Sequence, residues 1–311
     1  MGKSWVDAGA SGCGEGSWWA GKRWTVLACG VAAAACVVAA AVVVPVILSG
    51  AEGGGGFASD TRVEAGCNAS YYSGVGATLR DRELILSLHD TLSSSARKPL
   101  SYRETWAALE VLDSGQGGCG PQKVSDIYSK ACWLASHDRC GKSVSKAGQC
   151  YNREHSWPKS WWGGFDQGQG ATTDLVGLFL VDGKLNSKRR NNPFGEVGKV
   201  LEEWPSKARI GYCRDWQGKC FEPPDEFKGD LARAHFYLSV RYAGVWECCE
   251  TKVTNRTAVS TLAESTLRRW HRQDPVSERE RRRNDLIHSR FQGTRNPFVD
   301  CPTFEARIQD F

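Results

Sequence analysis

The most constraining stretch of this chain is the decapeptide Tyr-Asn-Arg-Glu-His-Ser-Trp-Pro-Lys-Ser at residues 151–160. It places a carboxylate, Glu154, directly beside an imidazole, His155, with cationic side chains within a few residues. If the segment is extended, neighbouring side chains point to opposite faces of the strand. One group could then hold a metal ion while the other takes a proton. An isolated Glu-His pair is a weak signal, because two surface residues give the same pattern.

The segment at residues 172–195 gives the decapeptide a structural context. An apolar run rich in Val, Leu and Phe changes there into a polar, basic stretch, which predicts a strand, a turn and a short helix. Asp182 is a candidate N-cap for that helix. Asn186 stands three residues before Arg189 and four before Arg190, so one helical face presents an amide beside cations. A strand with Glu-His, a second strand and a helix with Asn form a ββα unit.

Together these pieces resemble the endonuclease I family of secreted and periplasmic nucleases, which belongs to the His-Me finger, or ββα-metal, superfamily. The resemblance extends to further stretches in the same order. The matching stretches are Asn-Arg-Glu-His-Ser-Trp-Pro-Lys-Ser at 152–160, Val-Asp-Gly-Lys-Leu-Asn-Ser-Lys-Arg-Arg-Asn-Asn-Pro-Phe-Gly at 181–195, Phe-Glu-Pro-Pro-Asp-Glu-Phe-Lys-Gly-Asp-Leu-Ala-Arg-Ala at 221–234, Arg-Tyr at 241–242, Trp-His-Arg-Gln-Asp-Pro-Val-Ser at 270–277 and Gln-Gly-Thr-Arg-Asn-Pro-Phe-Val-Asp at 292–300. The resemblance implies an α+β fold in which helices surround a ββα-metal core.

The resemblance also implies an activity and the residues that carry it. The expected reaction is metal-dependent hydrolysis of phosphodiester bonds in DNA, with RNA as a second candidate substrate and without marked sequence specificity. His155 would act as the general base on water, and Glu154 and Asn186 would hold one Mg²⁺, with Ca²⁺ or Mn²⁺ as alternatives. From its place on the helix we add Arg189 as a candidate catalytic residue that grips the phosphate. Four further cations are candidates for nucleic-acid binding: Arg153, Lys159, Lys184 and Arg190.

Two departures from the family pattern bear on activity. Many relatives carry Asp-Leu-His and then a polar residue where this chain has Asp-Leu-Val-Gly at 174–177, so Val176 replaces an imidazole. Residues 161–173 contain no Arg, although some relatives place a phosphate-binding Arg there. An alternative function is therefore a catalytically weak protein that keeps the fold and binds nucleic acid outside the cytoplasm. A third class, a structural or interaction protein braced by disulfides, predicts no affinity for nucleic acid.

The N-terminal region predicts export. Residues 25–48 contain no charge, which is enough to span a bilayer and exceeds the core of about 7–15 residues in a signal peptide. Lys22 and Arg23 precede this run, which favours a transmembrane signal anchor with residues 1–24 as a cytoplasmic head and the rest lumenal or extracellular. A cleaved signal peptide is the alternative, and the protein would then be secreted. Residues 49–66, rich in Gly, predict a flexible linker.

The cysteines predict a disulfide-braced domain at residues 67–311. Three of the 13 cysteines precede the linker, and an even number follow it without any C-x-x-C pair of the kind that structural zinc sites use. Those beyond the linker are Cys67, Cys119, Cys132, Cys140, Cys150, Cys213, Cys220, Cys248, Cys249 and Cys301. They predict up to five disulfides in an oxidising compartment, with a connectivity that the sequence leaves open. Sequons at Asn68 and Asn255 predict a glycoprotein.

Outside the ββα unit, apolar residues recur at helical spacing in several segments. They predict helices at residues 76–92, 101–112, 226–242, 259–272 and 277–290, and a strand or helix at 124–133. The chain carries 40 Lys and Arg against 35 Asp and Glu, so the distribution of charge is more informative than its total. Five arginines crowd the 277–290 helix: Arg279, Arg281, Arg282, Arg283 and Arg290. Either a nucleic-acid interface or a solvated charged face explains them. No protein partner follows from the sequence.

Overall fold

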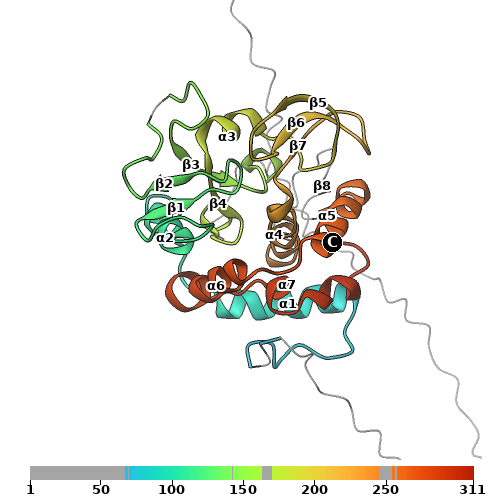
Figure 1. The fold of residues 1–311 in the computed structure, drawn as a ribbon. Coiled ribbons are helices and arrows are strands. Elements are labelled where there is room, and N and C mark those ends of the chain that lie inside the picture. Colours follow the sequence, from blue (N-terminus) through green and yellow to red (C-terminus); the bar gives the residue numbers. More distant parts are fainter. Residues whose placement is uncertain (1–66, 69, 142, 163–169, 245–253, 256–257) are drawn as a thin grey trace, which may run out of the picture. The chain divides into compact units, whose positions relative to one another are not determined.

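The computed structural model describes residues 67–311 except 69, 142, 163–169, 245–253 and 256–257 (Figure 1). They belong to one compact unit, Thr61–Phe311. Within this described part, no helix is long and apolar enough to cross a bilayer. The predicted head, span and linker at residues 1–66 lie outside it, so the membrane anchor stays a prediction.

The predicted ββα unit is present. β3 (Tyr151–His155) pairs antiparallel with β4 (Leu178–Asp182), and α3 (Gly183–Arg189) follows β4 directly. β4 is buried along its whole length, which explains its continuous apolar sequence. Because β3 is extended, Glu154 and His155 project from its opposite faces. The strand therefore separates the two groups as the sequence predicts.

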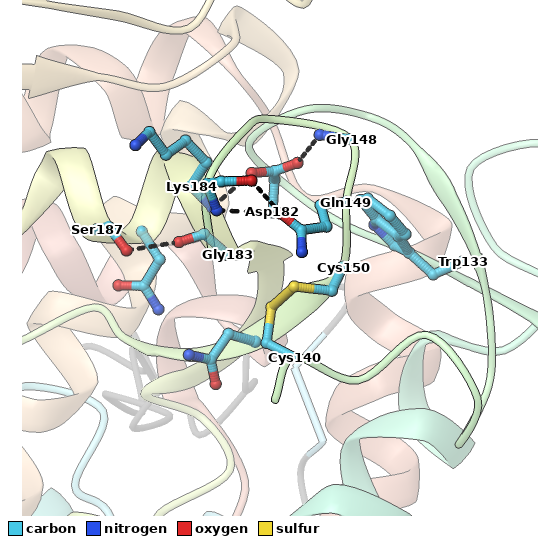
Figure 2. Close-up of a disulfide and its surroundings, with 12 residues drawn as sticks. Trp133, Cys140, Gly148, Gln149, Cys150, Asp182, Gly183, Lys184 and Ser187 are labelled. Atoms are coloured by element: carbon cyan, nitrogen blue, oxygen red, sulfur yellow. Dashed lines mark hydrogen bonds between the residues drawn. A yellow bond between two sulfur atoms is a disulfide. The ribbon is translucent and has the colours of Figure 1, made fainter. Parts of the chain in front are cut away.

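Both ends of α3 have a local cause. The Asp182 carboxylate accepts hydrogen bonds from the backbone N–H groups of Lys184 and Leu185 at 2.7 and 3.1 Å, which confirms it as the N-cap. Its second oxygen accepts from the backbone N–H of Gly148 at 2.6 Å (Figure 2). The helix ends where Arg190 adopts a left-handed φ of 53°. These contacts fix which side chains of α3 turn toward β3.

A disulfide packs against the start of α3. The sulfurs of Cys140 and Cys150 lie beside Gly183 (Figure 2), where an added Cβ would stand 2.3 Å from the sulfur of Cys140. Only glycine fits such a close approach. The disulfide therefore holds the first turn of the helix that carries Asn186.

Helices surround the ββα unit, as predicted, with bounds that differ by a few residues from the sequence-based ranges. They are α1 (Asp81–Ser95), α2 (Glu104–Asp113), α4 (Lys228–Arg241), α5 (Thr261–Gln273) and α6 (Glu278–Leu286), which continues as a π-helical segment (Ile287–Gln292). The short helix α7 (Pro297–Asp300) is not predicted from the sequence. α4 is buried on all sides and contacts α1, α5 and α7, so it is the central helix of this layer (Figure 1). The core cluster spans these helices and the ββα unit.

The remaining elements are short. The segment predicted as strand or helix forms a hairpin of β1 (Lys123–Ser125) and β2 (Cys132–Leu134). The remaining short elements are the strands β8 (Thr254–Asn255) and β9 (Ala258–Val259) and the 3₁₀ turns Lys159–Trp162, Ala171–Thr173, Asp225–Phe227 and Pro302–Arg307.

The sequence does not predict the three-stranded antiparallel sheet of β5 (Val197–Glu203), β6 (Arg209–Cys213) and β7 (Lys219–Glu222). β5 is exposed at most of its positions and its pairing with β6 is irregular. It therefore lacks the strict alternation that identifies a half-buried strand. The sheet lies next to α3 (Figure 1).

The arginine-rich helix α6 is a packing element. Arg283 is buried, forms an ion pair with Asp113 at 2.8 Å and donates to backbone carbonyls in and beside β4. Arg279 pairs with Asp230 of α4 at 3.2 Å, and Arg282 donates to a carbonyl of α2 at 2.6 Å. These arginines join α6 to its neighbours, which favours a structural role for them over a nucleic-acid interface.

Among the described residues, four disulfides confirm the prediction of a disulfide-braced domain. The pairs are Cys67–Cys301, Cys119–Cys132, Cys140–Cys150 and Cys213–Cys220. Cys248 and Cys249 lie outside the described residues, so a fifth disulfide stays a prediction.

The disulfides should stabilise the fold unequally. Cys67–Cys301 closes a separation of 234 residues, whereas Cys213–Cys220 closes one of 7. In the chain-entropy model, losing them costs about 5 and about 2.5 kcal/mol respectively. We expect the double serine variant of the first pair to unfold at a clearly lower urea concentration than that of the second. Equal midpoints would contradict this account.

Candidate active site

Glu154 is buried, with 3% of its surface exposed. One of its two carboxylate oxygens accepts hydrogen bonds from a neutral and from a cationic donor. The hydroxyl of Tyr128 and the guanidinium of Arg189 both donate to its Oε1, each at 2.8 Å. Burial raises the pKa of Glu154, and Arg189 and Tyr128 oppose that rise. Burial also raises the pKa of Tyr128 well above its usual range, which keeps its hydroxyl a donor. Within the described part of the chain, Oε2 has no donor and is available to a ligand.

Arg189 lies inside the protein. It is 1% exposed, and it donates to the backbone carbonyls of His155 and Ser156 at 2.9 and 2.7 Å as well as to Glu154. Its guanidinium lies 4.3 Å from the centre of the Phe194 ring. The sequence places Arg189 on a helical face that presents cations to a phosphate, but its two terminal guanidinium nitrogens donate to protein oxygens. This environment favours a role in positioning Glu154 over direct contact with substrate.

His155 occupies the opposite face of β3. Its Nε2 lies 2.9 Å from the carbonyl oxygen of Thr172, and because a carbonyl only accepts, Nε2 carries the hydrogen and Nδ1 holds the lone pair. Burial, with smaller contributions from the nearby cations Lys159, Arg153 and Arg189, lowers the pKa of His155 to about 4 against the opposing effect of the Thr172 bond. The imidazole is therefore neutral at neutral pH, as a general base must be.

Asn186 projects from α3 toward β3. Its Nδ2 donates to the backbone carbonyl of Arg153 at 3.1 Å, the residue directly before Glu154. Because the amide nitrogen is engaged in this bond, Oδ1 is the atom that Asn186 can offer to a cation. The site thus offers a carboxylate oxygen of Glu154 from β3 and an amide oxygen of Asn186 from α3. The ion pair between Glu154 and Arg189 joins these two elements.

These two oxygens fit a hard divalent cation. Mg²⁺ and Ca²⁺ take oxygen ligands, and Mg²⁺ keeps several waters and binds through one or two protein groups together with substrate phosphates. Among the described residues, no three His, Cys, Asp or Glu side chains gather at one point. Glu154 and Asn186 are therefore the candidate ligands of the ion.

The predicted cationic residues fall on two sides of α3. Arg153 stacks over the rings of Tyr102 and Trp106 at 3.6 and 4.3 Å, and burial lowers its pKa. Lys159 lies exposed, 4.8 Å from the ring centre of Tyr102. Lys184 and Arg190 instead line a groove between α3 and the three-stranded sheet.

Two tyrosines belong to the site without any sequence signal. Tyr128 comes from the segment after β1 and reaches Glu154 as described above. Tyr102 is 41% exposed, and its ring stacks on His155 with centres 6.0 Å apart and planes at 17°. Both lie far from the decapeptide in sequence, so only the fold brings them to it.

The side chain of Val176 points away from the candidate groups, whereas the carbonyl of Gly177 accepts a hydrogen bond at 2.9 Å from the backbone of Ser156, the residue after His155. Val176 lines a small internal cavity with Asp230 and Glu280, and none of Glu154, His155 and Asn186 lines it. Gly177 packs on α4, where an added Cβ would stand 3.0 Å from Leu238. A histidine at position 176 would therefore lie beside the charged side chains of Asp230, Glu280 and Arg283. Residues 163–169 of the segment without Arg lie outside the described residues.

Comparison with known proteins gives consistent matches. The family model described as Endonuclease I matches residues 83–303. An extracellular ribonuclease of Bacillus subtilis (strain 168) is 33% identical over 243 residues, 77% of this chain and 78% of the relative. The extracellular ribonuclease of Bacillus amyloliquefaciens is 35% identical over 226 residues, 71% and 72% of the two chains. Endonuclease-1 of Buchnera aphidicola subsp. Baizongia pistaciae is 29% identical over 130 residues, 41% and 46%.

Replacing Arg189 should reveal its role. Arg189→Ala leaves the buried Glu154 unpaired, which costs about 3–5 kcal/mol of unfolding free energy. Lys188→Ala is the matched control, because Lys188 pairs with Glu202 at the surface, where such pairs contribute about 0–1 kcal/mol. Urea denaturation of both variants measures the difference. A small loss of unfolding free energy that is equal in the two variants would contradict the role of Arg189 in positioning Glu154.

Proposed function

The chain belongs to the endonuclease I family and is an endonuclease, and from this premise we propose that it cleaves phosphodiester bonds with His155 as general base and a divalent metal ion held by Glu154 and Asn186. The arrangement of β3 is the observation that carries the proposal. It turns the Nδ1 lone pair of a neutral imidazole to one face, while on the other face Glu154 keeps one oxygen unengaged. Mg²⁺ is the ion that we propose, with Ca²⁺ or Mn²⁺ as alternatives.

Each of the candidate residues has its own role in the proposed reaction. His155 takes the proton of a water molecule through Nδ1 as the water oxygen attacks phosphorus, and Thr172 keeps the imidazole in the required tautomer and orientation. Glu154 and Asn186 would hold the ion, and Tyr128 and Arg189 orient Glu154. When bound, the ion supplies positive charge that stabilises the phosphate and the departing 3′-oxygen.

DNA and RNA are both proposed substrates. The groups that we assign to the reaction act on a phosphodiester and include none that would recognise a particular base or sugar, so we expect cleavage without marked sequence specificity. The names of the Bacillus relatives, extracellular ribonucleases, support RNA, and the Buchnera relative is named as an endonuclease.

The protein is proposed to act outside the cytoplasm. Disulfides persist in oxidising compartments, and the Bacillus relatives are named as extracellular. Residues 25–48 would tether the domain to the membrane or be removed on secretion.

Activity measurements with matched variants test the proposal. We expect the full chain to degrade plasmid DNA and a large RNA in Mg²⁺, and EDTA to stop both reactions. His155→Ala should lower the rate about 100- to 10,000-fold, the typical contribution of a general base. His137→Ala is the control, because that imidazole is exposed and pairs with Asp138.

Binding measured in EDTA distinguishes the alternatives. If the folded wild-type chain cleaves nothing but still retards nucleic acid in a gel, the catalytically weak binding protein replaces our proposal. Cleavage that resists both EDTA and His155→Ala would also contradict it.

A further inference from the structure

A groove of about 660 Å³ lies between α3 and the three-stranded sheet. We call it the outer groove. From α3 and the segment after it, Lys184, Lys188, Arg190 and Asn191 line it, and from the sheet Leu201, Ile210 and Lys219. Lys184 and Lys188 stand two residues before and after Asn186, so they occupy the helical face opposite to it. The outer groove is therefore separate from the Glu154 and Asn186 side of the helix.

The outer groove is basic. Glu202 is its one carboxylate lining residue and is paired with Lys188 at 2.7 Å. Within the described part of the chain, Lys184, Arg190 and Lys219 form no ion pair. A lining with three uncompensated cations attracts a polyanion.

The sheet adds an exposed aromatic ring on the same face. Lys199, Tyr212 and Lys219 stand side by side on β5, β6 and β7, so their side chains share one face of the sheet. Tyr212 is 45% exposed, and the two lysine nitrogens lie 5.9 and 6.0 Å from its ring centre. Ile210, two residues before Tyr212 on β6, lines the outer groove, so this row continues the groove.

We propose that the outer groove and the Lys199–Tyr212–Lys219 row form a binding site for single-stranded polynucleotide, an inference that rests on the proposed nuclease function. An unpaired base stacks on Tyr212 while the flanking lysines and Arg190 contact phosphates. Aromatic stacking between cations is the common means of binding single strands. A duplex keeps its bases stacked on one another and offers Tyr212 no free face.

The end of α3 connects this site to the catalytic residues. Asn191 lines the outer groove, and its side-chain amide lies 3.4 Å from the hydroxyl of Ser160. Ser160 follows Lys159, which lies against Tyr102 and so beside His155. α3 is about 10 Å long at 1.5 Å per residue, so a strand held at His155 has to pass only this helix end to enter the outer groove.

Binding without turnover tests the proposal independently of hydrolysis. In EDTA and in the His155→Ala background of the full chain, we would measure fluorescence anisotropy with 12-nucleotide single-stranded RNA, single-stranded DNA and duplex DNA. Tyr212→Ala should weaken single-strand binding at least about fivefold, which corresponds to the lower end of base stacking on an aromatic ring, and leave duplex binding unchanged. Tyr212→Phe should retain binding, because it keeps the ring.

Salt dependence tests the cationic part. Lys219→Ala should reduce the slope of log affinity against log salt by about 0.7, the value for one phosphate contact with a single strand. Lys123→Ala, an exposed lysine on β1, is the control and should leave the slope unchanged. A Tyr212→Ala loss on only one of the two single-stranded probes would assign the site to that sugar.

Three results would overturn the inference. They are unchanged single-strand binding by Tyr212→Ala, an equal loss on single-stranded and duplex probes, and an equal change in slope for Lys219→Ala and Lys123→Ala. None of them depends on whether the chain cleaves its substrate, so failure of this site is distinguishable from failure of the proposed function.

Discussion

The buried ion pair between Glu154 and Arg189 is the contact on which the candidate site depends. Removing two charges from water costs several kcal/mol per ion, and such a pair is tolerated only when further hydrogen bonds satisfy it. Arg189 meets this condition by donating also to the carbonyls of His155 and Ser156, and Tyr128 gives Glu154 a second donor. Arg189 of α3 thereby binds three oxygens on or next to β3. These bonds fix the position of α3, which carries Asn186, relative to β3, which carries Glu154.

The rest of the domain supports this unit from outside. Asp182 caps α3, and the Cys140–Cys150 disulfide packs on Gly183 in the same turn. α2 and α6 cover β4, which is buried throughout. The carboxylate and the imidazole therefore sit on a strand that cannot easily move, on two faces with different surroundings. The metal-dependent hydrolysis that we propose would require preorganisation of this kind.

Local patterns in the sequence predict the local parts of this structure. The decapeptide, the apolar run after it and the cap at Asp182 identify the ββα unit, since each acts over a few residues. Contacts between distant segments are not encoded in such patterns. Tyr128 and Tyr102 come to the site only through the fold, the disulfide partners follow from topology, and the exposed strand β5 carries no clear alternation. Arg189 lies on the expected helix, but nothing local indicates that it turns inward to Glu154. The family resemblance, which the match over residues 83–303 confirms, supplied the order of the motifs rather than these contacts.

The central claim is that the bonds from Tyr128 and Arg189 leave one oxygen of Glu154 for a cation. A measurement of metal binding tests this claim most directly. Isothermal titration of the full chain with Mn²⁺ would compare the wild type with Glu154→Gln and with Glu226→Gln, an exposed glutamate that pairs with Lys130. We expect one ion per chain for the wild type and the control, and an affinity at least about tenfold weaker for Glu154→Gln, because hard cations prefer a charged carboxylate oxygen. Wild-type affinity in Glu154→Gln would contradict the account.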